Sequence, residues 1–474
     1  MEFTLFGLVL MGYIVYIFCK NKKINQLLKK MIILTAICSL NIRMGYVLKI
    51  GNNVFGYSSF LIYITGLVSL LYIVRKRTIS KQLSSSVLCM FLVLVIGAFG
   101  NMLLPYKEKV VIGNWTEYVQ GKNVEFYLSE QSLKMGYYLV LFFVGLILIA
   151  SYSFFKESDF QDILSITIKI SKLSIVVGYV EYITKNIFHS QIITNLFVYI
   201  FGSYGAQQNF LISRGGFFAV QGATKESSMF TTVIFYISIM LIVDYAKTKA
   251  ENNKKWLLAC MVLLVINPAM SSIVYLCILG VIIFLYRNIW GFKRVNKVRN
   301  DRVLLLIIIV VAGGWFGVSQ MNVLLRSSNY IVHRIGVALQ QLQIIISGVG
   351  GVMYSSEAIR FSGIIYDIKL FARRPLFGFG LGSISCNSGI VTFLVNSGII
   401  GFGAWYHVIH KYMNKKNSLS EIIFTMCILI LPNIFLNDYE TIFCIAIPII
   451  LRCFVCLNVS NIPNDKMSLE NKEE

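Results

Sequence analysis

Charged side chains are scarce in this 474-residue chain: 14% of its residues are Asp, Glu, Lys or Arg, whereas 57% are hydrophobic. Soluble globular domains carry about 25% charged residues, so most of this chain is not a soluble domain. The mean hydropathy of +0.71 agrees with that conclusion. Apolar runs recur from Phe3 to Leu457 without a long polar break. They predict an all-α polytopic integral membrane protein.

Several functional patterns are also missing. The motif G-x-x-x-x-G-K-[ST] does not occur, which excludes a fused P-loop ATPase. Only four histidines are present and no cluster has metal-ligand spacing, so we expect no metal and no other cofactor. Nearly all of the ten cysteines fall inside apolar runs, which argues against a disulfide framework. The net charge of +21 indicates basic cytoplasmic loops, and no nucleic-acid partner is expected.

Hydropathy predicts about thirteen membrane spans. We expect them near 3–19, 31–49, 54–74, 85–104, 136–155, 164–184, 227–245, 256–267, 269–286, 303–321, 390–409, 421–436 and 441–457. Lysines follow the first apolar run instead of preceding it, which favours a retained first helix and an N-terminus outside. If successive loops alternate between the outer and the cytoplasmic side, every short basic loop is cytoplasmic. Residues 1–457 form one transmembrane domain in this interpretation, and 458–474 form a cytoplasmic tail.

Three long segments fall on the outer side: 105–135, 185–226 and 322–389. The first balances its charges, so we expect a solvated cap. The third is a large loop with six Lys or Arg residues against two acidic ones. Long loops can translocate whatever their charge, or the basic residues bind an anionic ligand, and both interpretations stay open.

The large loop contains the most informative stretch. Residues 357–374 predict an amphipathic helix on the outer membrane surface, with Ile364 and Ile368 on its apolar face and a second, exposed stripe of charge. Pro375 ends the helix, and a glycine-rich loop with free backbone N–H groups follows. Guanidinium and N–H donors together suit a diphosphate, although an interfacial helix touching lipid head groups is the alternative. The residues concerned are Arg360, Asp367, Arg373, Arg374, Gly378 and Gly380.

A second polar stretch precedes the span at 227–245. It places Arg214, Lys225 and Glu226 at the outer boundary. Glu226 is either a first-turn acid favoured by the helix dipole or a base that works beside an arginine. Arg43, near the outer end of the second span, either snorkels to the surface or faces the interior of the bundle as a functional group.

Three sets of residues carry a family resemblance. The first is Arg214, followed by glycines and then Lys225-Glu226-Ser227. The second is Arg360, the amphipathic helix and Arg374-Pro375-Leu376-Phe377-Gly378-Phe379-Gly380. The third is Asn387-Ser388, followed by Gly398-Ile399-Ile400-Gly401. The chain resembles the O-antigen polymerase and O-antigen ligase superfamily over roughly residues 200–410.

The resemblance implies a GT-C-like membrane glycosyltransferase (a hexosyltransferase-type polysaccharide polymerase) in the cytoplasmic (inner) membrane of a bacterium. Its substrates would be oligosaccharide repeat units on undecaprenyl pyrophosphate, and its product an O-antigen of lipopolysaccharide, a capsule or an exopolysaccharide. A chain-length regulator and a flippase of the same pathway are implied partners. A family ligase has His where this chain has Asn387, which favours the polymerase. The alternatives are the ligase, a flippase or transporter of the lipid-linked unit, and a non-catalytic scaffold.

The resemblance also assigns roles to the residues. Arg214 and Arg360 would stabilise the leaving diphosphate, and Glu226 would accept the proton of the acceptor hydroxyl. The expected substrate-binding residues are Lys225, Asp367, Arg373, Arg374, Gly378, Gly380 and Asn387.

Overall fold

The computed structural model shows a helical bundle and describes most of the chain. The described residues are 2–50, 53–76, 81–104, 106–111, 125–128, 132–202, 213–214, 216–267, 269–285, 308, 312–313, 315–317, 319–347, 356–384, 388–413 and 448–450. Several expected features therefore lie outside the described residues: the span at 421–436, the span at 441–457 except for its residues 448–450, the tail 458–474, and Asn387.

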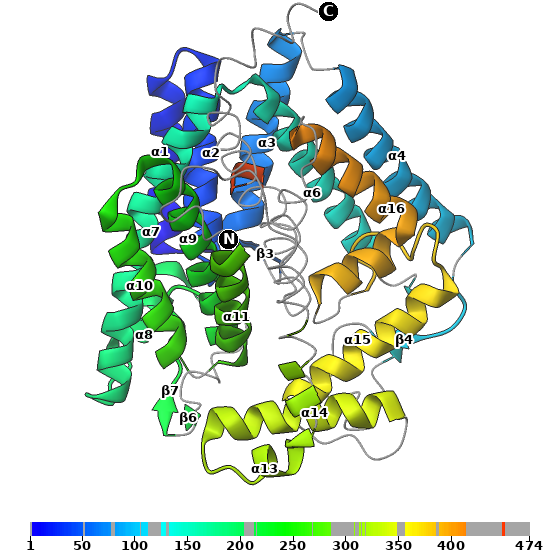
Figure 1. Cartoon of the computed structure of the whole chain (residues 1–474). Helices are drawn as coiled ribbons and strands as arrows, with labels where there is room; N and C mark the ends of the chain where they lie inside the picture. The colour runs from blue at the N-terminus through cyan, green and yellow to red at the C-terminus, as the bar shows by residue number, and fades with distance from the viewer. Residues whose placement is uncertain are drawn as a thin grey trace, which may run out of the picture.

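Helices form most of the described structure (Figure 1). They are α1 (Leu5–Lys20), α2 (Ile24–Asn41), α3 (Tyr57–Lys76), α4 (Lys81–Leu103), α6 (Ser132–Ser151), α7 (Glu157–Asn186), α8 (Ile192–Phe201), α9 (Ser227–Thr248), α10 (Glu251–Ile266), α11 (Met270–Leu285), α13 (Met321–Leu325), α14 (Tyr330–Ser347), α15 (Ser356–Arg373) and α16 (Gly389–Met413).

Among the described residues, six helices are long and apolar enough to cross a membrane: α3, α4, α6 with the turn after it, α7, α9 and α16. The apolar helices α1, α8 and α11 are shorter. The expectation of a helical membrane protein is confirmed at this level, whereas the thirteen spans and their orientation stay predictions. The expected bend at Asn267 is also confirmed, because it separates α10 from α11.

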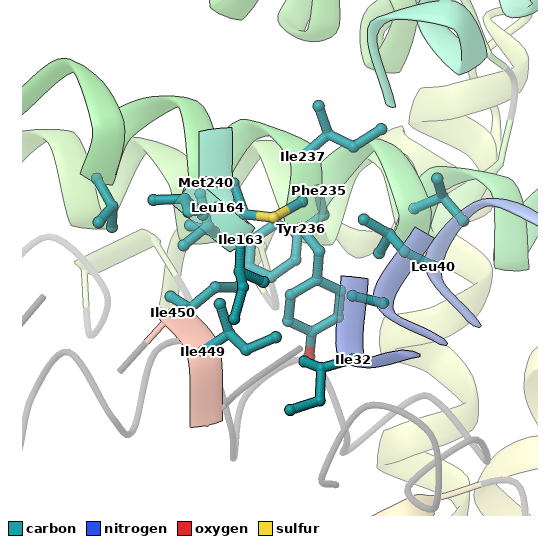
Figure 2. Close-up of a cluster of buried hydrophobic side chains, with 14 of the residues drawn as sticks. Ile32, Leu40, Ile163, Leu164, Phe235, Tyr236, Ile237, Met240, Ile449 and Ile450 are labelled. Atoms are coloured by element: carbon teal, nitrogen blue, oxygen red, sulfur yellow. The ribbon is translucent and has the colours of Figure 1, made fainter. Parts of the chain in front are cut away.

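Helix α9 forms the centre of the bundle. Its apolar residues are distributed all round the helix, a pattern that requires burial on every side, and 83% of its apolar window is buried. Figure 2 shows Tyr236 of α9 pointing toward Ile32 of α2. The same cluster includes Ile163 and Leu164 of α7 together with Ile449 and Ile450. The outer faces of α1 and α7 instead expose large apolar side chains, as a lipid-facing surface would.

Helices α13, α14 and α15 lie together at one end of the bundle, at the bottom of Figure 1. The antiparallel pair β6 (Ser213–Arg214) and β7 (Phe217–Phe218) lies at the same end. We call this end of the molecule the loop end. Strands β1 (Glu2–Phe3), β2 (Leu48–Ile50) and β3 (Asn53–Phe55) form a small antiparallel sheet.

Two expectations about the segments between spans were wrong. The second span was expected to continue to residue 49, but α2 ends at Asn41 and the chain then forms a bridge with Thr224 and the strand β2. The segment 105–135 is also more than a solvated cap. Its strand β4 (Val110–Val111), paired with β5 (Glu125–Phe126), is buried in a small core with Leu370, because two adjacent valines gain more from packing than from exposure.

Candidate functional site

A segment of residues 217–224 closes the loop end of the bundle just before α9; it is extended up to Gln221 and then turns at Gly222 and Ala223. It has no long partner strand, so side chains satisfy its backbone groups. The amide of Asn186, at the end of α7, accepts from Phe218 N at 2.7 Å and donates to Phe218 O at 3.1 Å. The amide of Asn267, at the α10–α11 bend, makes the same two contacts with Val220, at 3.3 and 3.2 Å. Two asparagines thus fix the path of the segment.

A buried carboxylate fixes the turn that follows. Glu181 of α7 is fully buried and accepts from Gln221 N at 3.2 Å and from Gly222 N at 2.6 Å. One turn along α7, the Lys185 Nζ lies 2.5 Å from Glu181 Oε1 and is buried as well. The lysine balances the charge, and the backbone N–H groups occupy the carboxylate lone pairs, which is the condition for burying an ion pair without a large loss of stability.

Arg43 enters this arrangement from the end of α2. Its backbone N donates to Ala223 O at 2.9 Å, and it forms a parallel bridge with Thr224. Its side chain turns back toward α2, where Nε donates to Ser39 O at 3.3 Å, and the residue is 9% exposed. Of the two interpretations of Arg43, the interior position is therefore confirmed. Charged side chains inside membrane-type bundles are usually functional, so Arg43 is a candidate site residue.

A second guanidinium converges on the same place. Tyr275 of α11 is buried, and its hydroxyl lies 2.9 Å from Thr232 Oγ1 of α9. The positive charges of Arg43 and Arg360 both act on this phenol. Arg360, in the first turns of α15, is half-buried. Two arginines from distant parts of the chain therefore lie within electrostatic range of one tyrosine hydroxyl, and guanidinium groups are well suited to bind a phosphate or another polyanion.

Lys225 and Glu226 lie beside Arg43. Thr224 Oγ1 lies 2.6 Å from Gln221 O and 2.8 Å from Glu226 O. Two residues of extended chain span at most about 7 Å, so the Glu226 backbone stays within that distance of the Arg43–Thr224 bridge. Glu226 directly precedes α9, and its exposed carboxylate accepts from Ser228 Oγ at 3.1 Å. The structure therefore brings Arg43, Lys225 and Glu226 together.

Arg214 is placed only by its backbone. It pairs with Phe217 in the β6–β7 hairpin, directly before the extended segment. Its side chain is outside what the structure describes.

The other arginines of the predicted stripe lie elsewhere. Arg360 and Arg374 are fourteen residues apart, which is about 21 Å along a helix axis. Arg373 donates to Tyr106 and to Glu108, and Arg374 donates to Asn101 Oδ1 and, at 2.6 Å, to Leu104 O. The two arginines therefore hold the chain that leaves α4 and do not lie near Arg360.

This second cluster has its own electrostatics. The hydrogen bond from Tyr106 and then the Arg373 guanidinium lower the pKa of the Glu108 carboxyl below its usual value. The Arg374 guanidinium lies 5.4 Å from the ring centroid of Phe379. Partial burial lowers the pKa of Arg374. These contacts fix the far end of α15 against α4.

Two expectations for this stretch were wrong. Arg360, Asp367 and Arg374 do not form an exposed stripe, because Asp367 is fully buried while the apolar Ile368 is exposed. The backbone N–H groups of the glycine-rich loop are not free either. Gly378 N donates to Arg374 O at 3.1 Å, and Gly380 N donates to Asn396 O at 2.8 Å.

The glycines instead allow the loop to dock on a break in α16. Gly398 has φ +67°, a left-handed conformation inside the helix. The carbonyls freed by the break, Val395 O and Asn396 O, accept from the loop at 2.9 and 2.8 Å. In return, Ile399 N donates to Pro375 O at 2.8 Å. A helix can break at membrane depth only if its freed groups find such partners.

Comparisons with known proteins supply no assignment: no family model matches the chain, and no match to a curated protein is found. Among the described residues, no three His, Cys, Asp or Glu side chains come close enough together to hold a metal ion.

Sequence reasoning assigned no site role to Tyr275, Glu181 or Lys185. A signal for the last two was present, since an acid and a lysine one helical turn apart in an apolar run form an ion pair. No sequence signal singles out Tyr275, because its role depends on where α2 and α15 bring their arginines.

Proposed function

We propose that the protein is a membrane glycosyltransferase that polymerises lipid-linked oligosaccharide repeat units into a bacterial surface polysaccharide. The glycan would pass from undecaprenyl pyrophosphate to an incoming lipid-linked repeat unit. The sequence resemblance supports the reaction class. The proposal places the protein in the inner membrane with its loop end outside.

One observation carries the proposal: Arg43 is buried and tied to Thr224 where α2 ends, at the end of an apolar bundle, and Arg360 lies close enough that both charges act on Tyr275. A diphosphate is dianionic or more, and paired guanidinium groups bind its oxygens through charge-assisted hydrogen bonds. A lipid carries such a group at the height where the bundle ends.

The reaction needs no cofactor. The bond between the anomeric carbon of the donor glycan and the diphosphate oxygen breaks, and a bond forms from that carbon to a hydroxyl oxygen of the acceptor sugar. Undecaprenyl pyrophosphate leaves with the bonding electron pair, and Arg43 and Arg360 stabilise its growing negative charge. The hydroxyl proton passes to a carboxylate, for which Glu226 is exposed and adjacent to Arg43. Arg214 and Lys225 lie on either side of the 217–224 segment and would contact phosphate or sugar.

A deletion strain tests the function. The proposal predicts loss of long glycan chains and retention of single repeat units at the cell surface, with long chains restored by the wild-type gene. Loss of the single repeats as well would identify a flippase. Single repeats and long chains that both stay on the lipid carrier, without transfer to a final acceptor, would identify a ligase. Unchanged glycans would contradict all three.

A further inference from the structure

A long apolar groove runs along the bundle between α1 and α7. Its volume is about 530 Å³, within the range of about 300–1,000 Å³ typical of ligand sites. Helix α2 lies along it from Lys30 to Asn41, and α7 from Ile166 to Val177. Each stretch covers eleven residue steps, or about 16 Å of helix. The groove is therefore elongated and extends through about half the thickness of a bilayer core.

The walls of the groove offer little to a polar ligand. Polar residues toward its loop end bond to one another: Ser174 Oγ donates to Asn41 Oδ1 at 2.7 Å, and Asn41 Nδ2 donates to Ser171 Oγ at 3.0 Å. Large apolar side chains, including Phe197, Phe201 and Phe230, form much of the rest. A ligand in this groove gains free energy by burying hydrocarbon.

The groove ends beside the arginine cluster. Ile42 and Ala223 line its loop end. Arg43 is the next residue after Ile42, and its backbone N donates to Ala223 O. A hydrocarbon chain in the groove would therefore carry its head group to the Arg43–Thr224 bridge, beside the basic residues Arg43 and Lys225. At the far end of the groove only Lys30 is charged.

We infer that this groove, which we call the α1–α7 groove, holds the isoprenoid chain of a polyprenyl diphosphate whose head group binds at Arg43. The inference rests on the proposed function for the nature of the lipid. An ordinary phospholipid has one phosphate, and it would not need the second guanidinium of Arg360. The groove thus adds a tail site to the diphosphate site and positions the reacting bond at the loop end.

Adjacent valines of α7 provide a matched pair of variants. Val177 lines the groove, whereas Val176 is exposed on the outer face of the same helix. Val177→Trp fills the groove and is expected to raise the KM for the lipid-linked unit about ten-fold with little change in kcat. The lost contacts stabilise the bound substrate and the transition state equally, so their loss weakens binding without slowing the chemical step. Val176→Trp adds the same ring on the lipid-facing side and should leave both constants unchanged. Equal effects of the two substitutions would contradict the inference.

Photo-crosslinking of the wild-type protein does not depend on how the variants fold. The probe is a polyprenyl diphosphate with a diazirine on its chain. We expect crosslinks to groove peptides of α1, α2 and α7, suppressed by unlabelled polyprenyl diphosphate but not by excess phosphatidylglycerol. Suppression by phosphatidylglycerol would overturn the inference in favour of bulk lipid. Crosslinks outside the groove, in a protein that still polymerises, would contradict the groove as the tail site and leave the proposed polymerase function standing. Groove crosslinks without polymerisation would support the groove and contradict the glycosyltransferase.

Discussion

Arg43 carries its charge at a position where the protein covers nine-tenths of its surface. Its backbone is tied to Ala223 and Thr224, so the guanidinium cannot follow a surface loop outward. Arg360 approaches from another element and acts on the same tyrosine. At the residue scale, the function proposed above depends on this convergence more than on any single sequence motif.

Neutralising either arginine should slow polymerisation strongly. Arg43→Gln and Arg360→Gln each remove one donor from a developing charge, and such losses cost about 10²–10³-fold in rate. The measurement is the rate of chain extension by purified protein. Arg75→Gln, at the exposed end of α3, is the matched control and should retain the wild-type rate. Wild-type rates in both site variants would remove the basis for a diphosphate site at Tyr275.

The buried pair in α7 predicts a stability effect. Lys185→Met leaves the fully buried Glu181 carboxylate without its counter-charge, which costs about 3–5 kcal/mol. The double variant Glu181→Gln/Lys185→Met removes both charges and keeps an oxygen that can accept from Gly222, so it should recover most of that loss. Thermal unfolding in detergent, followed by labelling of the buried Cys260, measures both. A single variant as stable as the wild type would show that the pair is not buried in solution.

At the scale of single elements, the break in α16 requires a glycine at residue 398 for full stability. A Cβ at this residue would lie 2.1 Å from Leu376 O, and φ is +67°. Gly398→Ala should therefore destabilise the protein by about 1–3 kcal/mol. Gly403→Ala, in the same helix with nothing within 4 Å of the added methyl, should instead gain about 0.5–1 kcal/mol. Unfolding midpoints compare the two, and a tolerated Gly398→Ala would mean that α16 is continuous.

The docking of the 106–111 segment on α15 should depend on pH. The folded-state pKa of Glu108 is below its usual value of 4.5, through Tyr106 and then Arg373. The carboxylate therefore stabilises docking at pH values above that usual value, and the stabilisation is lost as the pH falls through the lowered pKa. Hydrogen-exchange protection of residues 106–111, measured relative to the intrinsic exchange rate at each pH, should decrease in acid. Glu108→Gln should remove this pH dependence, and an unchanged acid response in that variant would contradict the assignment.

Sequence patterns predicted elements better than they predicted contacts. The amphipathic helix appeared as α15 and ended before Pro375, because apolar spacing and proline act within a few residues. Asp367 was placed on the wrong face, since helical spacing cannot say which side of α15 the rest of the chain covers. The role of the glycine-rich loop was missed for the same reason: its partners, Val395 and Asn396, are free only because α16 breaks at Gly398.

At the scale of the whole molecule, hydropathy correctly predicted a helical membrane-type bundle, because the length and apolarity of a span are properties of its own residues. The site is assembled from α2, α7, α9, α11 and α15, and no local pattern encodes that assembly. Arg43 was noticed as an embedded charge but was not linked to Arg360. The thirteen spans and the outward-facing loop end remain predictions.

Chain extension by the purified protein tests the central claim most directly. The wild-type chain, reconstituted in vesicles with lipid-linked repeat units as its only substrate, should produce polymers of many repeats and release undecaprenyl pyrophosphate in proportion. Arg43→Gln/Arg360→Gln vesicles should leave the repeats single. Two results with the wild-type protein would contradict a polymerase: repeat units that cross the bilayer but stay single, and repeat units that do not react at all.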